Sequence, residues 1–195
     1  KTSCGTMKNL NILKYSLCVF LLLSFCSANS QNRNLIWCFG DSAGIDFTNL
    51  QNPIPINTGM DGRGSCISIS DSLGSLQFYA STSDLLQIPY SESVLIRDAS
   101  HQIMNDGDSI VGHGWYQELV ITDIPDNLSL YYLFSIGVTA NYGLYYSIVD
   151  MSLNGGLGGV VQKNVQLENF KVVDCLKAIK HGNGRDWWII IRNAL

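Results

Sequence analysis

Apolar and polar residues alternate along most of the chain in short runs that end at turns, the pattern of half-buried β-strands. One unit, made of an apolar strand, a polar turn and an aromatic strand, occurs at residues 67–79, 119–134 and 176–191. Asp71, Asp123 and His181 occupy the same place in the three copies, with spacings of 52 and 58 residues. A period of this length predicts a repeated supersecondary unit.

Further strands are predicted outside the repeats. Residues 35–39 run into a glycine turn, residues 94–96 precede a polar loop, and residues 143–150 lead toward Asn154-Gly155, a dipeptide favoured in two-residue hairpin turns. Residues 48–66 contain two prolines and three glycines, and they predict a loop.

One segment has two interpretations. Residues 172–180 are the nearest candidate for a soluble helix, but the repeat predicts a strand there. Many short strands with frequent turns favour an all-β fold with one four-stranded antiparallel sheet per repeat, which describes the blade of a β-propeller. The chain stops four residues after Ile191, inside the third copy, so residues 31–195 are expected to form an incomplete propeller of about two to three blades, part of a longer protein.

The N-terminal segment has the pattern of a secretory signal. Residues 1–6 precede the first methionine and are interpreted as upstream or non-native residues. Residues 7–30 combine two lysines, the eleven-residue apolar run 15–25 and a small-residue cleavage site. The apolar run is short for a transmembrane helix, so we expect an exported chain with no membrane span after removal of the signal.

Charge and cysteine content narrow the classes of partner. Without the three lysines of residues 1–30, nine Lys and Arg of the total of twelve face sixteen Asp and Glu, a net charge of −7. Nucleic acid is therefore not an expected partner. The cysteines of the exported part, Cys38, Cys66 and Cys175, have no zinc or framework spacing. Two of them could pair after export, but small buried apolar cysteines are the favoured interpretation.

One serine motif suggests an enzyme. Gly40–Gly44 fits G-x-S-x-G, but the following residues do not predict the supporting helix of an α/β-hydrolase. Phe39–Ser42 also resembles the GDSL-type (SGNH) esterases, which would make Ser42 the nucleophile and His101 a candidate base. The other blocks of that family are incomplete or out of order, because Asp98-x-x-His101 precedes Asn105-Asp106. A secreted esterase is therefore the alternative, and enzyme activity is left uncertain but not favoured.

Two kinds of binding site are open alternatives. The loops at residues 105–108 and 123–127 offer oxygen ligands to calcium, although they lack the EF-hand pattern and polar turns are favoured. Adjacent aromatic pairs occur at residues 131–132, 145–146 and 187–188, and neighbours in a strand point to opposite faces. One member of each pair is expected to pack between sheets, and an exposed member could bind carbohydrate or peptide.

Several segments together resemble the N-terminal propeller-like region of large secreted proteins of Bacteroidota. They are residues 37–47, 65–71, 101–104, 145–158 and 180–188, of which 145–158 is the most specific. Such proteins often carry PKD-type repeats and end in a type IX secretion sorting domain. The resemblance implies a cell-surface or extracellular module without assigned catalysis, and it assigns no site residues. We therefore expect a non-catalytic module for binding or adhesion outside the cell, with an unknown protein or carbohydrate ligand.

Overall fold

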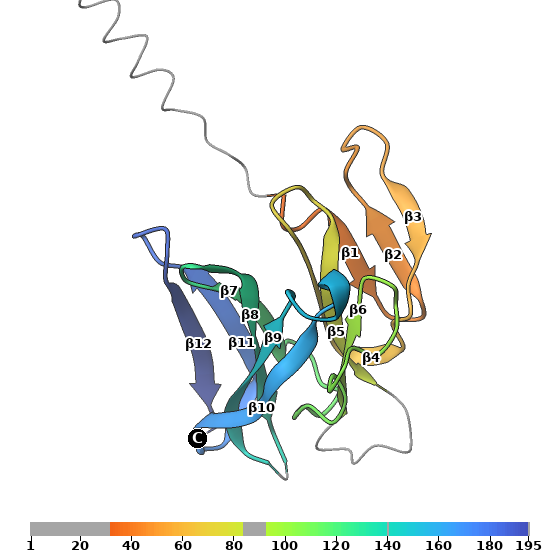
Figure 1. The fold of residues 1–195 in the computed structure, drawn as a ribbon. Coiled ribbons are helices and arrows are strands. Elements are labelled where there is room, and N and C mark those ends of the chain that lie inside the picture. The colour runs from red at the N-terminus through yellow and green to blue at the C-terminus, as the bar shows by residue number, and fades with distance from the viewer. Residues whose placement is uncertain (1–31, 84–92, 140, 195) are drawn as a thin grey trace, which may run out of the picture. The chain divides into compact units, whose positions relative to one another are not determined.

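The computed structural model describes residues 32–83, 93–139 and 141–194 (Figure 1). The predicted upstream segment, 1–6, and signal peptide, 7–30, lie outside the described residues. In the described ranges, no helix is long and apolar enough to cross a membrane.

Four antiparallel sheets follow one another along the described chain. The first contains β1 (Ile36–Phe39), β2 (Ala43–Asp46) and β3 (Ile54–Asn57), and the second contains β4 (Gly62–Ser70), β5 (Leu76–Ser83) and β6 (Val94–Asp98). The third contains β7 (Leu119–Ile124), β8 (Asn127–Gly137), β9 (Gly143–Asp150) and β10 (Gly159–Glu168). The last is the hairpin of β11 (Val172–Lys180) and β12 (Trp187–Asn193). The predicted all-β class is confirmed, but only the third sheet has the four strands expected of every repeat.

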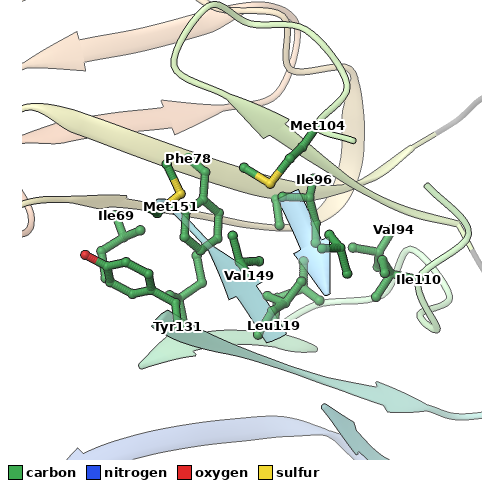
Figure 2. Packing of buried hydrophobic residues seen from close by; sticks show 14 residues of the cluster. Ile69, Phe78, Val94, Ile96, Met104, Ile110, Leu119, Tyr131, Val149 and Met151 are labelled. Carbon is green, nitrogen blue, oxygen red and sulfur yellow. The ribbon is translucent and has the colours of Figure 1, made fainter. Parts of the chain in front are cut away.

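The third sheet has a hydrophobic core on each face because its side chains alternate in direction. Toward the second sheet, β7 and β8 contribute Leu119, Ile121, Tyr131 and Leu133 to the cluster that Figure 2 shows. Toward β11 and β12, the same two strands contribute Val120, Phe134 and Ile136. The smaller cluster between the first and second sheets includes Ile36, Cys38, Met60 and Tyr79.

The three predicted repeat copies are the hairpins β4–β5, β7–β8 and β11–β12. Asp71 and His181 start their turns in the same way, since each carbonyl accepts a hydrogen bond from the glycine three residues later, Gly74 or Gly184. Asp123 does not match them, because it lies inside β7 opposite Tyr131. The equivalence predicted for these three residues is therefore wrong by one position in the middle copy.

Three local predictions have clear outcomes. Residues 172–180 form a strand, as the repeat predicted. The loop predicted at 48–66 is wrong, because it contains β3 and the start of β4. Pro55 is accommodated there because β3 is an edge strand, where a missing N–H is tolerated. The two-residue turn at Asn154-Gly155 is also wrong, since both residues have positive φ but belong to a 3₁₀ turn within the longer connection from β9 to β10.

Candidate ligand-binding crevice

A crevice of about 190 Å³ opens where the β7–β8 and β11–β12 hairpins meet. Its walls combine three aromatic rings, two carboxylates and a buried threonine hydroxyl. The lining residues are Thr122, Asp123, Pro125, Tyr132, Phe134, Asp186, Trp187 and Ile189. The strand alternation that places Tyr132 and Phe134 on one face of β8 also directs them toward this crevice.

Asp123 joins the two hairpins at the crevice. Its Oδ1 accepts a hydrogen bond of 3.0 Å from Trp187 Nε1. Lys180 Nζ lies 3.4 Å from Asp123 Oδ2 and 4.2 Å from the centroid of the Trp187 ring. The carboxylate therefore fixes the indole while the ammonium group covers one ring face, an arrangement that combines an ion pair with a cation–π contact.

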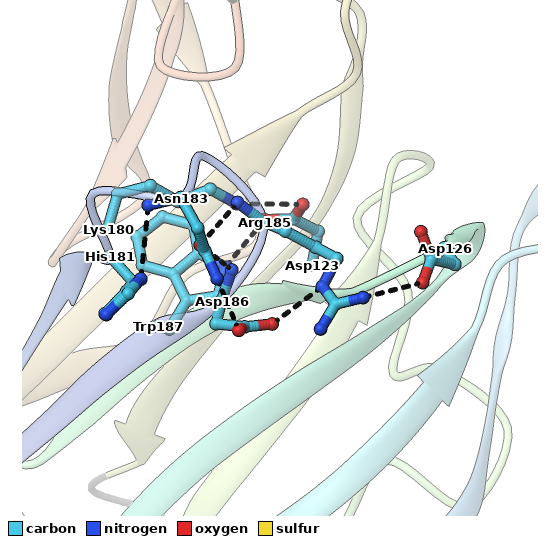
Figure 3. A network of polar contacts seen from close by, with 8 residues as sticks. All are labelled: Asp123, Asp126, Lys180, His181, Asn183, Arg185, Asp186 and Trp187. Atoms are coloured by element: carbon cyan, nitrogen blue, oxygen red, sulfur yellow. Dashed lines mark hydrogen bonds and ion pairs between the residues drawn. The ribbon is translucent and has the colours of Figure 1, made fainter.

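The turn that joins β11 to β12 contributes Asp186 to the crevice. Figure 3 shows the polar contacts of this turn. Asn183 Oδ1 accepts hydrogen bonds of 3.0 Å from the backbone N–H groups of Arg185 and Asp186, and Asn183 Nδ2 donates to Asp186 Oδ2 at 2.6 Å. Arg185 Nε donates to Asp186 Oδ1 at 3.0 Å, which lowers the pKa of Asp186 from its ordinary value. Arg185 also lies 3.7 Å from Asp126 on the other hairpin.

The crevice combines charge-paired carboxylates with aromatic walls. Asp123 and Asp186 already face Lys180 and Arg185, so a ligand does not have to neutralise them. Their carboxylate oxygens keep acceptor capacity, because each oxygen offers two lone pairs. Aromatic walls with hydrogen-bond acceptors at one end suit a ligand with both an apolar face and hydroxyl or N–H groups.

The proposed esterase residues are both in tight turns. Ser42 has a φ of 60° in the β1–β2 turn, and its backbone N–H donates to the Met60 carbonyl. His101 Nδ1 lies 3.2 Å from the Tyr79 hydroxyl. Asp98 accepts hydrogen bonds from Ser100 and Gln102, so it caps its own turn instead of orienting the imidazole. Within the described residues, no hydrogen bond joins Ser42 to His101.

The predicted calcium loops have other contacts. Asp108 pairs with Lys163 at 3.1 Å, and Asp123 and Asp126 take part in the contacts around the crevice. In the described parts of the chain, no group of three or more His, Cys, Asp or Glu side chains is placed to hold a metal ion.

In two of the aromatic pairs, the adjacent side chains point to opposite faces of the strand, as the sequence predicted. Tyr131 is buried in the core toward the second sheet, while Tyr132 packs against Phe134 and Tyr146 on the opposite face. Trp187 lines the crevice, whereas Trp188 is 60% exposed on the other face of β12. The sequence located these pairs, but it did not indicate that Asp123 and Trp187 come together, because 64 residues separate them.

A second polar site was missed by the sequence interpretation. Glu118 is completely buried before β7, and its Oε2 accepts a hydrogen bond of 3.0 Å from the backbone N–H of His113. Burial raises the pKa of Glu118 to about 7 and lowers that of His113. The only sequence signal is the turn-like run Gly112–Trp115 before an apolar strand, which does not reveal that a carboxylate folds back into it.

Comparisons with protein-family models, curated proteins and solved structures found no match.

Proposed function

We propose that the chain is a non-catalytic binding or adhesion module that acts outside the cell and holds its ligand in the crevice between β7–β8 and β11–β12. The observation that supports this proposal is the set of aromatic walls beside charge-paired carboxylates. Nothing in the surroundings of Ser42 or His101 favours the esterase alternative, and the helices of that fold are absent from the described residues.

A carbohydrate is the ligand class that fits best. Sugar C–H groups can pack on Tyr132, Phe134 or the uncovered part of Trp187, while hydroxyl groups donate to Asp123 and Asp186. An amine ligand is disfavoured because Lys180 and Arg185 already occupy the carboxylates. A protein partner with a protruding polar side chain is the competing ligand.

The matched tryptophans of β12 provide the test. Saturation-transfer NMR with glucose, galactose, mannose and N-acetylglucosamine should detect at least one ligand of the wild-type chain. Trp187→Leu should weaken its binding by about tenfold or more, since truncation of a central Trp of a binding site typically costs roughly 2 kcal/mol or more. Trp188→Leu should leave the affinity unchanged because its side chain lies on the opposite face. Binding that survives the Trp187 change, or no binding of any of these sugars, would contradict the carbohydrate proposal.

Export is part of the proposal. It is supported by the pattern of residues 7–30 and by the resemblance to secreted proteins of Bacteroidota. N-terminal sequencing of the protein recovered from its source should start at Gln31. A mature protein that retains residues 7–30 would contradict the proposed cleavage.

We also propose that the sheets are successive blades of an incomplete β-propeller. Ser70, Asp123 and Lys180 are the equivalent residues of β4, β7 and β11 before their turns. When the hairpins are aligned at these three residues, the same face of each hairpin points toward the sheet that follows it in the chain. β4–β5 buries that face against β7–β8, and β7–β8 buries it against β11–β12. The outer face of β11–β12 is then the surface that a further blade would cover, and dye binding to that surface tests the proposal.

A further inference from the structure

Cys38 and Cys66 lie on strands that run side by side in opposite directions. The Arg33 carbonyl accepts a hydrogen bond of 2.8 Å from the Ser70 N–H. Ser68 Oγ donates to the Ile36 carbonyl at 2.7 Å and accepts from the Cys38 N–H at 3.3 Å.

Gly40 and Gly62 extend this antiparallel alignment of the two strands. A side chain on Gly40 would collide with the Gly62 carbonyl, so the two backbones are in close approach there. Residue numbers therefore rise along β1 as they fall along β4. Cys38 lies opposite the stretch between Gly62 and Ser68, and Cys66 is within this stretch.

The two thiols also share one surface depression. A crevice of about 260 Å³ is lined by both cysteines and by Ser68. Cys66 and Ser68 are two residues apart on β4, so their side chains point to the same face of the strand. The Ser68 hydroxyl contacts β1, and both side chains therefore lie on the side of β4 that faces β1. Burial, and after it the nearby Cys66, raises the pKa of the Cys38 thiol to about 12. Only Cys38 is buried as the sequence analysis expected, because Cys66 is exposed and Cys175 is half-buried.

We propose that Cys38 and Cys66 form a disulfide bond that ties the first sheet to the second when the chain meets an oxidising environment. Both are thiols in this structure, as is Cys175 on β11. Cys175 stays a thiol, because it lies in the last sheet and lines no crevice with either of the other two among the described residues. The bond would add a covalent link between two strands that hydrogen bonds of Ser68 and Ser70 already join.

The oxidant is a small-molecule or protein disulfide, such as oxidised glutathione. The exposed Cys66 thiolate attacks one glutathione sulfur and releases one glutathione thiolate. The Cys38 thiolate then attacks the Cys66 sulfur, breaks the mixed disulfide and releases the second glutathione. The protein loses two protons and two electrons, and the glutathione disulfide is reduced to two thiols. Since the high pKa of Cys38 slows this second attack in the folded state, bond formation should be fastest during folding.

Tryptic mapping is a direct test because Arg63 separates the two cysteines. The full chain is refolded with reduced and oxidised glutathione, free thiols are alkylated, and the digest is analysed without reductant. Peptides 34–63 and 64–97 should appear as one species, lighter by two hydrogen atoms than their sum, and should separate after reduction. Peptide 172–177 should carry an alkylated Cys175. Two separate peptides with alkylated Cys38 and Cys66, or a bond from either to Cys175, would overturn the proposal.

Stability gives an independent measurement. Reductant should lower the melting temperature of the oxidised wild-type chain by roughly 5–10 °C, since a loop of about 28 residues is no longer closed in the unfolded state. Cys66→Ser should melt near the reduced wild type and should not respond to reductant. Cys175→Ser should keep the full response. A response that persists in Cys66→Ser would also refute the bond.

Discussion

At the scale of single residues, Glu118 is a carboxyl group that the fold removes from water. Its side chain is fully inaccessible, and backbone N–H groups of the preceding loop surround its carboxylate. The pKa rises to about 7 because loss of hydration outweighs these hydrogen bonds, and Asp174 on β11 adds a smaller repulsion. The loop before β7 therefore surrounds a carboxyl group that gains or loses its proton near neutral pH.

This environment predicts a pH-dependent stability. The folded state binds the Glu118 proton more tightly than the unfolded state, whose pKa is near 4.5. The contribution is therefore favourable below about pH 4.5, declines between pH 4.5 and 7, and is lost above the folded pKa. Over this window, the free energy of unfolding should decrease by about 3 kcal/mol with rising pH.

Urea unfolding of the wild type and Glu118→Gln at several pH values isolates this group. The glutamine variant should lack the decrease, while other titrating groups, including His113, contribute equally to both proteins. Because burial lowers the pKa of His113, its own contribution has the opposite sign and is lost as pH falls. Parallel pH profiles for the two proteins would show that Glu118 has an ordinary pKa.

The residues of the candidate site could be predicted only in part. The sequence identifies Tyr131-Tyr132 and Trp187-Trp188 as pairs with divided roles, because alternation along a strand is a local property. The contact of Asp123 with Trp187 depends on how two hairpins pack, and no local pattern records it. Glu118 was missed for the same reason, since its partners are backbone N–H groups of a loop.

At the scale of elements, the turns of the hairpins β4–β5 and β11–β12 each contain a glycine whose N–H donates to the carbonyl three residues earlier, but the surroundings of the two glycines differ. Gly74 and Gly184 both have positive φ, at 94° and 73°. A Cβ on Gly74 would lie 2.7 Å from Leu35 Cδ1, whereas a Cβ on Gly184 would meet nothing within 4 Å. A substitution at Gly184 therefore tests backbone strain alone, whereas a substitution at Gly74 tests backbone strain together with a steric contact.

Alanine substitutions should reveal this difference. Gly184→Ala should lower the free energy of unfolding by about 1 kcal/mol, the cost of a left-handed conformation for a residue with a side chain. Gly74→Ala should lower it by a further amount of about 1 kcal/mol, because Leu35 must also move. Chemical denaturation of both variants measures the two effects. Equal losses would mean that Leu35 adapts without cost.

Element prediction from the sequence was accurate where apolar alternation was uninterrupted. The three hairpins and β9 were located in this way. The sequence did not predict β3, because Pro53, Pro55 and the glycines were interpreted as strand breakers. Such residues also occur on edge strands, and only the pairing of β2 with β3 identifies this edge. The register of the middle repeat was wrong because its turn is shorter, with Ile124 opposite Asn127.

At the scale of the whole molecule, the consistent orientation of the hairpins supports the proposal of propeller blades. The face of β11–β12 away from the crevice carries Ile179, Trp188 and Ile190, which are exposed by 53%, 60% and 47%. The equivalent faces of the preceding hairpins are buried. An uncovered apolar face of this kind favours association with another surface.

The proposal predicts that the 195-residue chain binds the dye ANS and self-associates through this face. Trp188→Lys combined with Ile190→Lys should reduce ANS emission by roughly half or more and shift the chain toward monomer, since both replaced side chains belong to the uncovered patch. Folding stability should change little because these side chains are already exposed.

Leu128→Lys is the matched control, since Leu128 is 86% exposed on a different hairpin. Analytical ultracentrifugation and ANS fluorescence provide the measurements. A monomeric wild type without ANS binding, or equal effects of the control, would mean that the outer face of β11–β12 is an ordinary solvent-exposed surface and would remove the support for a further blade.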